Sequence, residues 1–185
     1  MKKLLTIAAI SLLLLSFSGA AGWQKLWNEP VSTVVVNHDQ NAGTTDLFAV
    51  NKSSKEIYEY RGTPNDWKRI GTASKMYAAA GGDLFKIDPG ATGVFVYSGQ
   101  TDLWQQIGGP AAKIYGGGGK LYATNPDTGD IYEYKGQSYE WTKIGGPGRT
   151  FAAAGAYGTR VPGPQGGDPG QALLFGISPG GDARF

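Results

Sequence analysis

The sequence predicts an all-β fold built from repeated units of four short strands. The chain has 185 residues, and 30 of them are Gly, more than twice the average share of about 7%. It also contains 5 Trp, 10 Tyr and 7 Phe, which makes it too aromatic for a flexible Gly-rich linker. Trp residues recur at a fixed interval, and a fixed interval of this length is typical of a repeat architecture.

The repeat is 37 residues long and is set by Trp67, Trp104 and Trp141. Other positions keep the same register around each Trp. An Ile or Val lies ten residues before it, a Gly five before it, and an Ile-Gly pair starts three residues after it. A Tyr lies seven residues before each Trp, and this column consists of Tyr60, Tyr97 and Tyr134. Agreement in so many columns over three copies predicts one structural unit per copy.

Each copy divides into four strands separated by turns rich in Gly, Asn, Asp and Pro. In the copy that ends near Trp141, we expect strands at 112–116, 121–125, 130–135 and 140–144. Four short strands at this period are typical of a β-propeller blade. Blades converge on an axis, so the innermost strand has the least room for side chains. We therefore assign the Ala and Gly runs at 78–81, 116–119 and 152–155 to the innermost strands.

The fourth copy is divided between the two ends of the chain. The segment Trp23–Leu26 matches Trp104–Ile107, which is the fourth strand of a complete copy. The last copy is interrupted by a Pro- and Gly-rich insertion at 159–170 and stops at Phe185, before a Trp segment of its own. Because a propeller must cover its first and last edges, we expect the Trp23 segment to pair with the C-terminal copy. Copies therefore start near 23, 67, 104 and 141.

The N-terminal residues 1–22 have the layout of a secretory signal peptide. Two Lys are followed by an apolar run at 4–17 and then by small residues up to Gly22. The apolar run is shorter than the ~20 residues of a membrane span, and an uncleaved anchor is the alternative. Removal of 1–22 leaves 15 basic and 15 acidic residues. We expect a secreted domain at 23–185, extracellular or periplasmic, with no membrane span and no nucleic-acid partner.

The chemistry-bearing residues do not form a catalytic set. The chain has no Cys, which excludes disulfides and Cys nucleophiles. His38 is the only His, and it lies in a segment unique to the first copy. Glu59 and Glu133 occupy equivalent positions, but Val96 stands there in the copy between them. The loop 125–130 lacks the full EF-hand pattern. We therefore expect no enzyme activity, no metal and no cofactor.

The motifs Trp67–Gly71, Trp104–Pro110 and Trp141–Pro147, with the strand Ile131–Tyr134, resemble the tectonin repeats of tachylectin-like β-propeller lectins. The resemblance covers roughly 23–158. It implies a secreted or surface-recognition lectin that binds glycans, including lipopolysaccharide or methylated sugars. Some relatives act in intracellular membrane trafficking instead. Such propellers usually have more than four blades, so the chain is a small propeller, a fragment, or part of a ring that a homo-oligomer completes.

Eight residues are the candidate glycan-binding positions, and each has a structural alternative. The Trp column would stack on sugars or fill gaps between blades, and the Tyr hydroxyls would bind sugars or protein groups. The polar loop residues would bind sugar hydroxyls or cap turns. The candidates are Trp67, Trp104, Trp141, Tyr60, Tyr97, Tyr134, Asp88 and Asn125. We expect carbohydrate recognition at several weak, equivalent sites. The alternatives are a protein-interaction propeller without a sugar site and a fragment of a longer protein.

Overall fold

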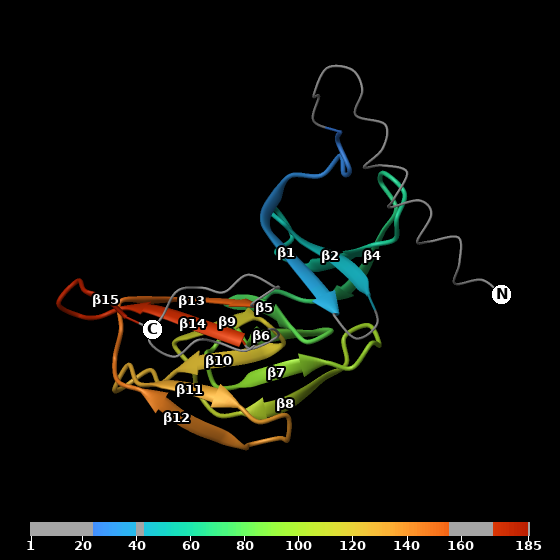
Figure 1. The fold of residues 1–185 in the computed structure, drawn as a ribbon. Helices are drawn as coiled ribbons and strands as arrows, with labels where there is room; N and C mark the ends of the chain where they lie inside the picture. Colours follow the sequence, from blue (N-terminus) through green and yellow to red (C-terminus); the bar gives the residue numbers. More distant parts are fainter. Residues whose placement is uncertain (1–23, 40–42, 156–171, 185) are drawn as a thin grey trace.

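The computed structural model of the protein describes residues 24–39, 43–155 and 172–184. The described residues form fifteen β-strands and no helix, so they include no helix that could cross a membrane. This confirms the all-β fold class. The strands form four antiparallel sheets, numbered 1 to 4 along the chain (Figure 1). The predicted signal peptide at 1–22, Trp23, the insertion at 159–170 and Phe185 lie outside the described residues.

Every sheet is a meander in which consecutive strands are hydrogen-bonded neighbours. Sheet 1 consists of β1 (Val31–Asp39), β2 (Thr44–Asn51), β3 (Ile57–Tyr60) and β4 (Trp67–Gly71). Sheet 2 consists of β5 (Met76–Ala80), β6 (Asp83–Ile87), β7 (Val94–Tyr97) and β8 (Trp104–Gly108). Sheet 3 consists of β9 (Lys113–Gly117), β10 (Lys120–Thr124), β11 (Ile131–Tyr134) and β12 (Trp141–Gly145). Sheet 4 consists of β13 (Thr150–Gly155), β14 (Ala172–Ile177) and β15 (Ala183–Arg184). The ends of β9–β12 lie one residue from the predicted ends.

Strand register repeats together with the sequence. In sheets 1 to 3, the Tyr that ends the third strand pairs with the Trp that begins the fourth. A register shift falls at the same place in all three sheets, directly after the first residue of the third strand. The 37-residue period therefore specifies how the strands pair as well as how many there are.

The innermost strands β1, β5, β9 and β13 contact one another in succession, and the other strands of each sheet spread outward from them (Figure 1). Glycine makes the close approach possible. A Cβ at Gly116 would collide with the carbonyl oxygen of Ala79, and a Cβ at Gly117 would collide with that of Ala153. This confirms that the Ala and Gly runs mark the innermost strands. The exceptions are Gly81 and Gly118–Gly119, whose φ values of 61°, 59° and 76° place them in the turns that follow β5 and β9.

The hydrophobic core lies between successive sheets, in one cluster between sheets 1 and 2 and another between sheets 2 and 3. The Ile of the repeated Ile-Gly pair contributes to both clusters. Ile70 has an exposed fraction of 0%, and Ile107 has one of 1%. Full burial of such a side chain contributes about 1.5–3 kcal/mol. The fourth strands of sheets 1 and 2 therefore supply core to the junction with the next sheet.

The first and last sheets leave apolar side chains uncovered. In sheet 1, Val34 and Val36 of β1 are each 59% exposed. At the junction with sheet 4, Ile144 of β12 is 43% exposed, although it is equivalent to the buried Ile70 and Ile107. The four sheets thus form a β-propeller-like arrangement in which the first and last sheets differ from those between them.

Candidate functional site

The repeated Trp side chains lie at the junctions between sheets. The indole of Trp141 lies over Gly108 of the preceding sheet, and its Nε1 donates a hydrogen bond to the carbonyl of Ile107 (2.9 Å). Trp104 lies over Gly71, where an added Cβ would be 2.9 Å from the indole nitrogen, but this Nε1 has no hydrogen-bond partner among the described residues. The absence of a side chain at these two Gly positions leaves the space that each indole fills.

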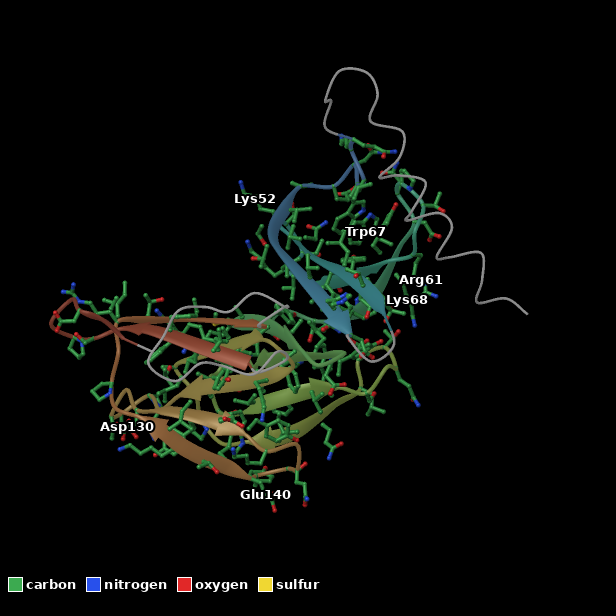
Figure 2. The ribbon with its side chains drawn as sticks, viewed as in Figure 1. Lys52, Arg61, Trp67, Lys68, Asp130 and Glu140 are labelled. Atoms are coloured by element: carbon green, nitrogen blue, oxygen red, sulfur yellow. The ribbon has the colours of Figure 1, made fainter. Side chains whose placement is uncertain are left out.

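Trp67 makes the equivalent contact with the N-terminal segment. Its Nε1 donates to the carbonyl of Leu26 (3.1 Å), and its ring stacks on Trp27 with 4.9 Å between centroids. Figure 2 shows Trp67 inside the side-chain layer of sheet 1, whereas Lys68 lies on the outer side. All three Trp candidates therefore make packing contacts, and the structure leaves their role in binding a sugar a prediction.

The Tyr candidates pack on the Trp of their own repeat. The ring centroids of Tyr60, Tyr97 and Tyr134 lie 5.0, 5.1 and 5.1 Å from those Trp rings. Tyr134 also meets Phe85 of the preceding sheet edge-on, at 6.3 Å. Burial raises the pKa of the Tyr134 hydroxyl, and the negative charge of Asp83 adds to this. The hydroxyl of Tyr97 is buried and has no hydrogen-bond partner among the described residues.

A cleft of about 250 Å³ lies between sheets 2 and 3 beside Tyr134. We call it the Tyr134 cleft. It is smaller than the ~300–1,000 Å³ of pockets for drug-sized ligands, and its size suits a single small polar ring. Apolar groups line part of it and charged groups line the rest. The lining side chains include Phe85, Leu121, Tyr134, Asp83, Lys120 and Lys135.

The two Lys side chains of the Tyr134 cleft are held in place by ion pairs with Glu133. Glu133 accepts from Lys120 (2.8 Å) and from Lys135 (2.9 Å). Burial would raise the pKa of Glu133, but the hydrogen bonds from the two ammonium groups outweigh it and lower the pKa. On the sheet 2 side, burial raises the pKa of Asp83, and the charge of Asp39 raises it further. The cleft therefore offers cationic donors on one wall and a carboxylate on the other.

The junction between sheets 1 and 2 has the same aromatic frame but different polar groups. Tyr97 occupies the position equivalent to Tyr134. Val96 stands at the position equivalent to Glu133, and Ser98 at the position equivalent to Lys135. Lys86 is unique to this junction; its ammonium lies 4.4 Å from the centre of a Trp104 ring, and burial lowers its pKa. The aromatic columns were predicted from the repeat. The ion pairs of the rim were missed because the pattern skips sheet 2, although Glu59 and Arg61 form the equivalent pair in sheet 1 (3.0 Å).

The loop candidates lie at the opposite end of the sheets from the Tyr column, as the strand register shows. The Asp88 carboxylate accepts the N–H of Gly93 (2.7 Å). Burial would raise the pKa of Asp88, but the hydrogen bonds of the loop outweigh it and lower the pKa. Asn125 Oδ1 accepts the N–H groups of Asp127 (2.8 Å) and Thr128 (2.9 Å). Both side chains are engaged in turns, and neither lines the Tyr134 cleft.

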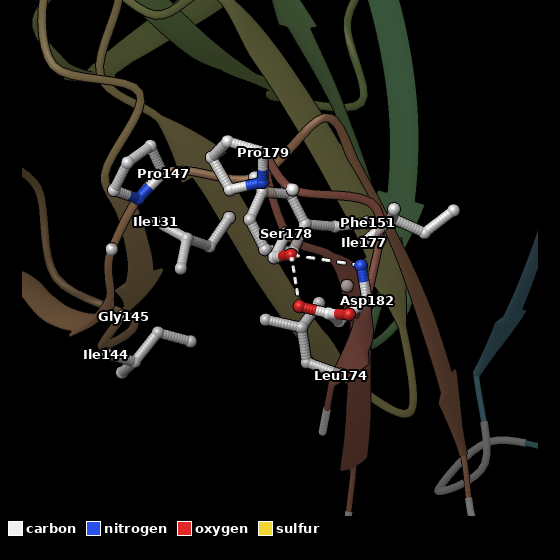
Figure 3. Close-up of a pocket in the computed structure, with 14 residues that line it drawn as sticks. Ile131, Ile144, Gly145, Pro147, Phe151, Leu174, Ile177, Ser178, Pro179 and Asp182 are labelled. Atoms are coloured by element: carbon white, nitrogen blue, oxygen red, sulfur yellow. Dashed lines mark hydrogen bonds between the residues drawn. The ribbon is translucent and has the colours of Figure 1, made fainter.

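Two further cavities lie on the loop side of the sheets. One, of about 150 Å³, brings Trp141 and Asn125 together beside Tyr132. The other, of about 530 Å³, lies between sheets 3 and 4 and is lined largely by apolar and Gly residues (Figure 3). None of the eight candidate residues lines this larger cavity. The predicted site residues are therefore distributed over several junctions instead of forming one constellation.

Ion pairs that were not predicted from the sequence also connect the outer strands. Arg69 donates to Glu56 (2.6 Å) within sheet 1 and to Asp102 (2.7 Å) of sheet 2. Its hydrogen bonds lower the pKa values of both carboxyls. Lys143 and Asp130 (2.7 Å) form the equivalent pair in sheet 3. The sequence feature that could have predicted these pairs is an acidic residue 13 positions before a basic one, which occurs in two copies.

Within the described ranges, no group of three or more His, Asp or Glu side chains is placed to hold a metal ion. A scan against protein-family models finds no match to the chain, and a search of curated proteins finds none either. The similarity to tectonin repeats stays a prediction that rests on the repeated motifs.

Proposed function

We propose that the protein is a β-propeller that recognises carbohydrate without chemical conversion, and that the Tyr134 cleft is a binding site. The observation that carries this proposal is the composition of the cleft. An aromatic ring, two ammonium groups and a carboxylate line a space of about 250 Å³. Sugars present both C–H faces and hydroxyl groups, so they need apolar and hydrogen-bonding surfaces at close quarters.

Each group has a defined role in this proposal. The ring of Tyr134 provides an apolar wall for the C–H face of a sugar, and its hydroxyl provides a donor and an acceptor. Lys120 and Lys135 each give one hydrogen bond to Glu133 and retain further N–H donors for the ligand. Asp83 accepts from sugar hydroxyls. The two ammonium groups favour a sugar that carries an acidic group, as lipopolysaccharide-type glycans do.

Affinity at one small cleft would be weak, and repetition compensates for this. The frame of Tyr and Trp rings recurs in sheets 1 to 3. Linked weak sites gain avidity on a multivalent surface without any new contact. A secreted location, predicted from residues 1–22, would bring the sites to such surfaces.

A glycan array followed by titration calorimetry tests the proposal. Tyr134→Phe removes the hydroxyl, and Lys135→Ser introduces the residue that Ser98 provides in the equivalent position. We expect each variant to weaken binding about tenfold, the usual loss for a hydrogen bond that involves a charged group. Tyr132→Phe, on the same strand as Tyr134 but outside the lining of the cleft, is the matched control and should leave the affinity unchanged. A folded protein that binds no glycan, or binds one equally well in both variants, would contradict the proposal and favour the protein-interaction alternative.

A further inference from the structure

The two Lys side chains of the Tyr134 cleft converge on a single atom. The Nζ of Lys120 lies 2.8 Å from Oε1 of Glu133, and the Nζ of Lys135 lies 2.9 Å from the same oxygen. The two nitrogens are therefore no farther apart than the sum of these distances. Two oxygens of one oxyanion can accept from both ammonium groups across such a separation, through charge-assisted hydrogen bonds.

The ammonium groups are open to solvent, whereas the carboxylate that holds them lies inside. The side chain of Glu133 is 15% exposed, and those of Lys120 and Lys135 are 46% and 40% exposed. An ammonium group has three N–H donors, and Glu133 takes one from each Lys. N–H donors thus remain on both side chains, at positions that the ion pairs fix.

The charges of this wall fit a ligand with a single negative charge. Two ammonium groups and one carboxylate leave an excess of one positive charge. Asp83 lines the opposite wall and takes part in no ion pair in the part of the chain that the structure describes. Its carboxylate opposes a second negative charge in the cleft. A monoanion therefore neutralises the Lys wall, and hydroxyl groups of the same ligand can donate to Asp83.

Glycine residues of three turns line the edge of the cleft. A Cβ added at Gly81 would lie 3.2 Å from the carbonyl oxygen of Gly119, so the turns after β5 and β9 meet on one side. A Cβ added at Gly136 would meet nothing within 4 Å, and the same holds for Gly119. The approach to the neighbouring Lys135 is therefore open.

The junction between sheets 1 and 2 lacks this pattern of charge. The position of Lys120 is taken by Asp83 in sheet 2 and by Asp46 in sheet 1. Val96 and Ser98 stand at the positions of the other two members of the ion-paired wall. At the positions that form the Tyr134 cleft, this junction therefore has two carboxylates and no ammonium group, and an acidic ligand would be repelled there.

We propose that the Tyr134 cleft selects glycans that carry a singly charged oxyanion, a carboxylate or a sulfate ester, and that only this one of the two junctions among sheets 1 to 3 does so. The oxyanion lies between Lys120 and Lys135, and the sugar ring lies against Tyr134 with hydroxyl groups toward Asp83. The inference rests on the proposed function and narrows it, because the aromatic frame repeats whereas the charge selection does not.

Calorimetric titration with matched sugars at neutral pH and low ionic strength tests the selection. The probes are the methyl glycosides of glucose, galactose and mannose, with the uronate and the sulfate ester of the primary hydroxyl of each. We expect at least one of these acids to bind about tenfold more tightly than its neutral parent, the usual gain from a hydrogen bond to a charged group. The matching phosphate ester, largely a dianion above its second pKa of about 6, should bind no more tightly than the sulfate ester.

Variants of the wall test where the selection arises. Lys120→Met and Lys135→Met each leave one ammonium group beside Glu133 and no excess of positive charge, so the acidic sugar should bind no more tightly than its neutral parent. Lys113→Met is the matched control. Lys113 begins β9 of the same sheet, is exposed and does not line the cleft, so this variant changes the net charge equally and should keep the preference. Asp83→Asn should strengthen binding of the phosphate ester.

Equal affinity of the native protein for acidic and neutral sugars would overturn the inference and leave the proposed function in place. A preference for acid that survives both cleft variants, or that Lys113→Met also abolishes, would overturn it as well, because the net charge and not the cleft would then attract the ligand. Phosphate esters that bind tenfold more tightly than sulfate esters would overturn the selection for a single charge. Absence of binding to every sugar would overturn the proposed function itself, together with this inference.

Discussion

Gly108→Ala should destabilise the protein by about 2–4 kcal/mol. An added Cβ at this position would lie 2.8 Å from Nε1 of Trp141 and 3.1 Å from Cε2. The indole would have to move, and the hydrogen bond to the Ile107 carbonyl would be lost at a cost of about 1 kcal/mol. Forcing a methyl group into a filled junction costs a further ~1–3 kcal/mol. The φ of Gly108 is not positive, so the effect is steric.

Gly109→Ala is the matched control. It lies one residue further along the chain, its added Cβ would meet nothing within 4 Å, and its φ is not positive either. We expect a change within about 0.5 kcal/mol, as for surface substitutions in general. Equilibrium unfolding in urea, followed by both Trp fluorescence and circular dichroism, measures the two variants.

A double variant tests the same contact more specifically. Trp141→Phe shortens the side chain that collides with the new methyl group, so it should recover part of the stability lost in Gly108→Ala. The double variant should therefore be less destabilised than the sum of the single variants. If Gly108→Ala unfolds at the same urea concentration as Gly109→Ala, the position of the indole does not depend on the missing side chain, and the steric reasoning is refuted.

Three further changes test other contacts. Gly116→Ala should cost about 3 kcal/mol or more because it forces β5 and β9 apart, whereas Gly146→Ala, with open space around it, should be neutral by urea unfolding. Arg69→Met should lower the free energy of unfolding at pH values above the ordinary carboxyl pKa of about 4, and the difference from the native protein should disappear as the pH falls below that value. A difference in unfolding free energy that stays the same in acid would show that the ion pairs do not stabilise the fold. Tyr97→Phe removes a buried hydroxyl without a described partner, so its thermal midpoint should match or exceed the native value.

The repeat predicted most of the fold because one set of columns controls strand ends, register and junction packing. The Trp column predicted the junction packing, and the Ala and Gly runs predicted the innermost strands. Sheet 1 departs from the pattern because β1 extends to Asp39, beyond the end of β5 in the equivalent hairpin. That extension contains His38 in a segment with no counterpart in the other copies, so the repeat held no information about it.

The polar rim of the Tyr134 cleft could not be predicted in the same way. Glu133 and Lys135 belong to β11 and its following turn, whereas Asp83 belongs to the preceding sheet. Their proximity depends on how two sheets pack, and sheet 2 has Val96 and Ser98 at the positions equivalent to Glu133 and Lys135. Asp88 and Asn125 resembled the rim residues in chemistry, but strand direction placed their loops at the other end of the sheets. Periodicity therefore predicted the frame, and sheet packing determined which charged groups meet across it.

The direction of the Trp contacts has a consequence for folding during synthesis. Trp67, Trp104 and Trp141 each dock on a segment that precedes them in the chain. The docking surface is thus already outside the ribosome when the Trp that needs it emerges. Sheets 1 to 3 can assemble in the order of translation, each on a finished neighbour, and the surface that waits for the next copy is an Ile-Gly pair and not a large indole ring. A chain with the opposite polarity of contacts would leave each Trp ring exposed until the next copy had been translated.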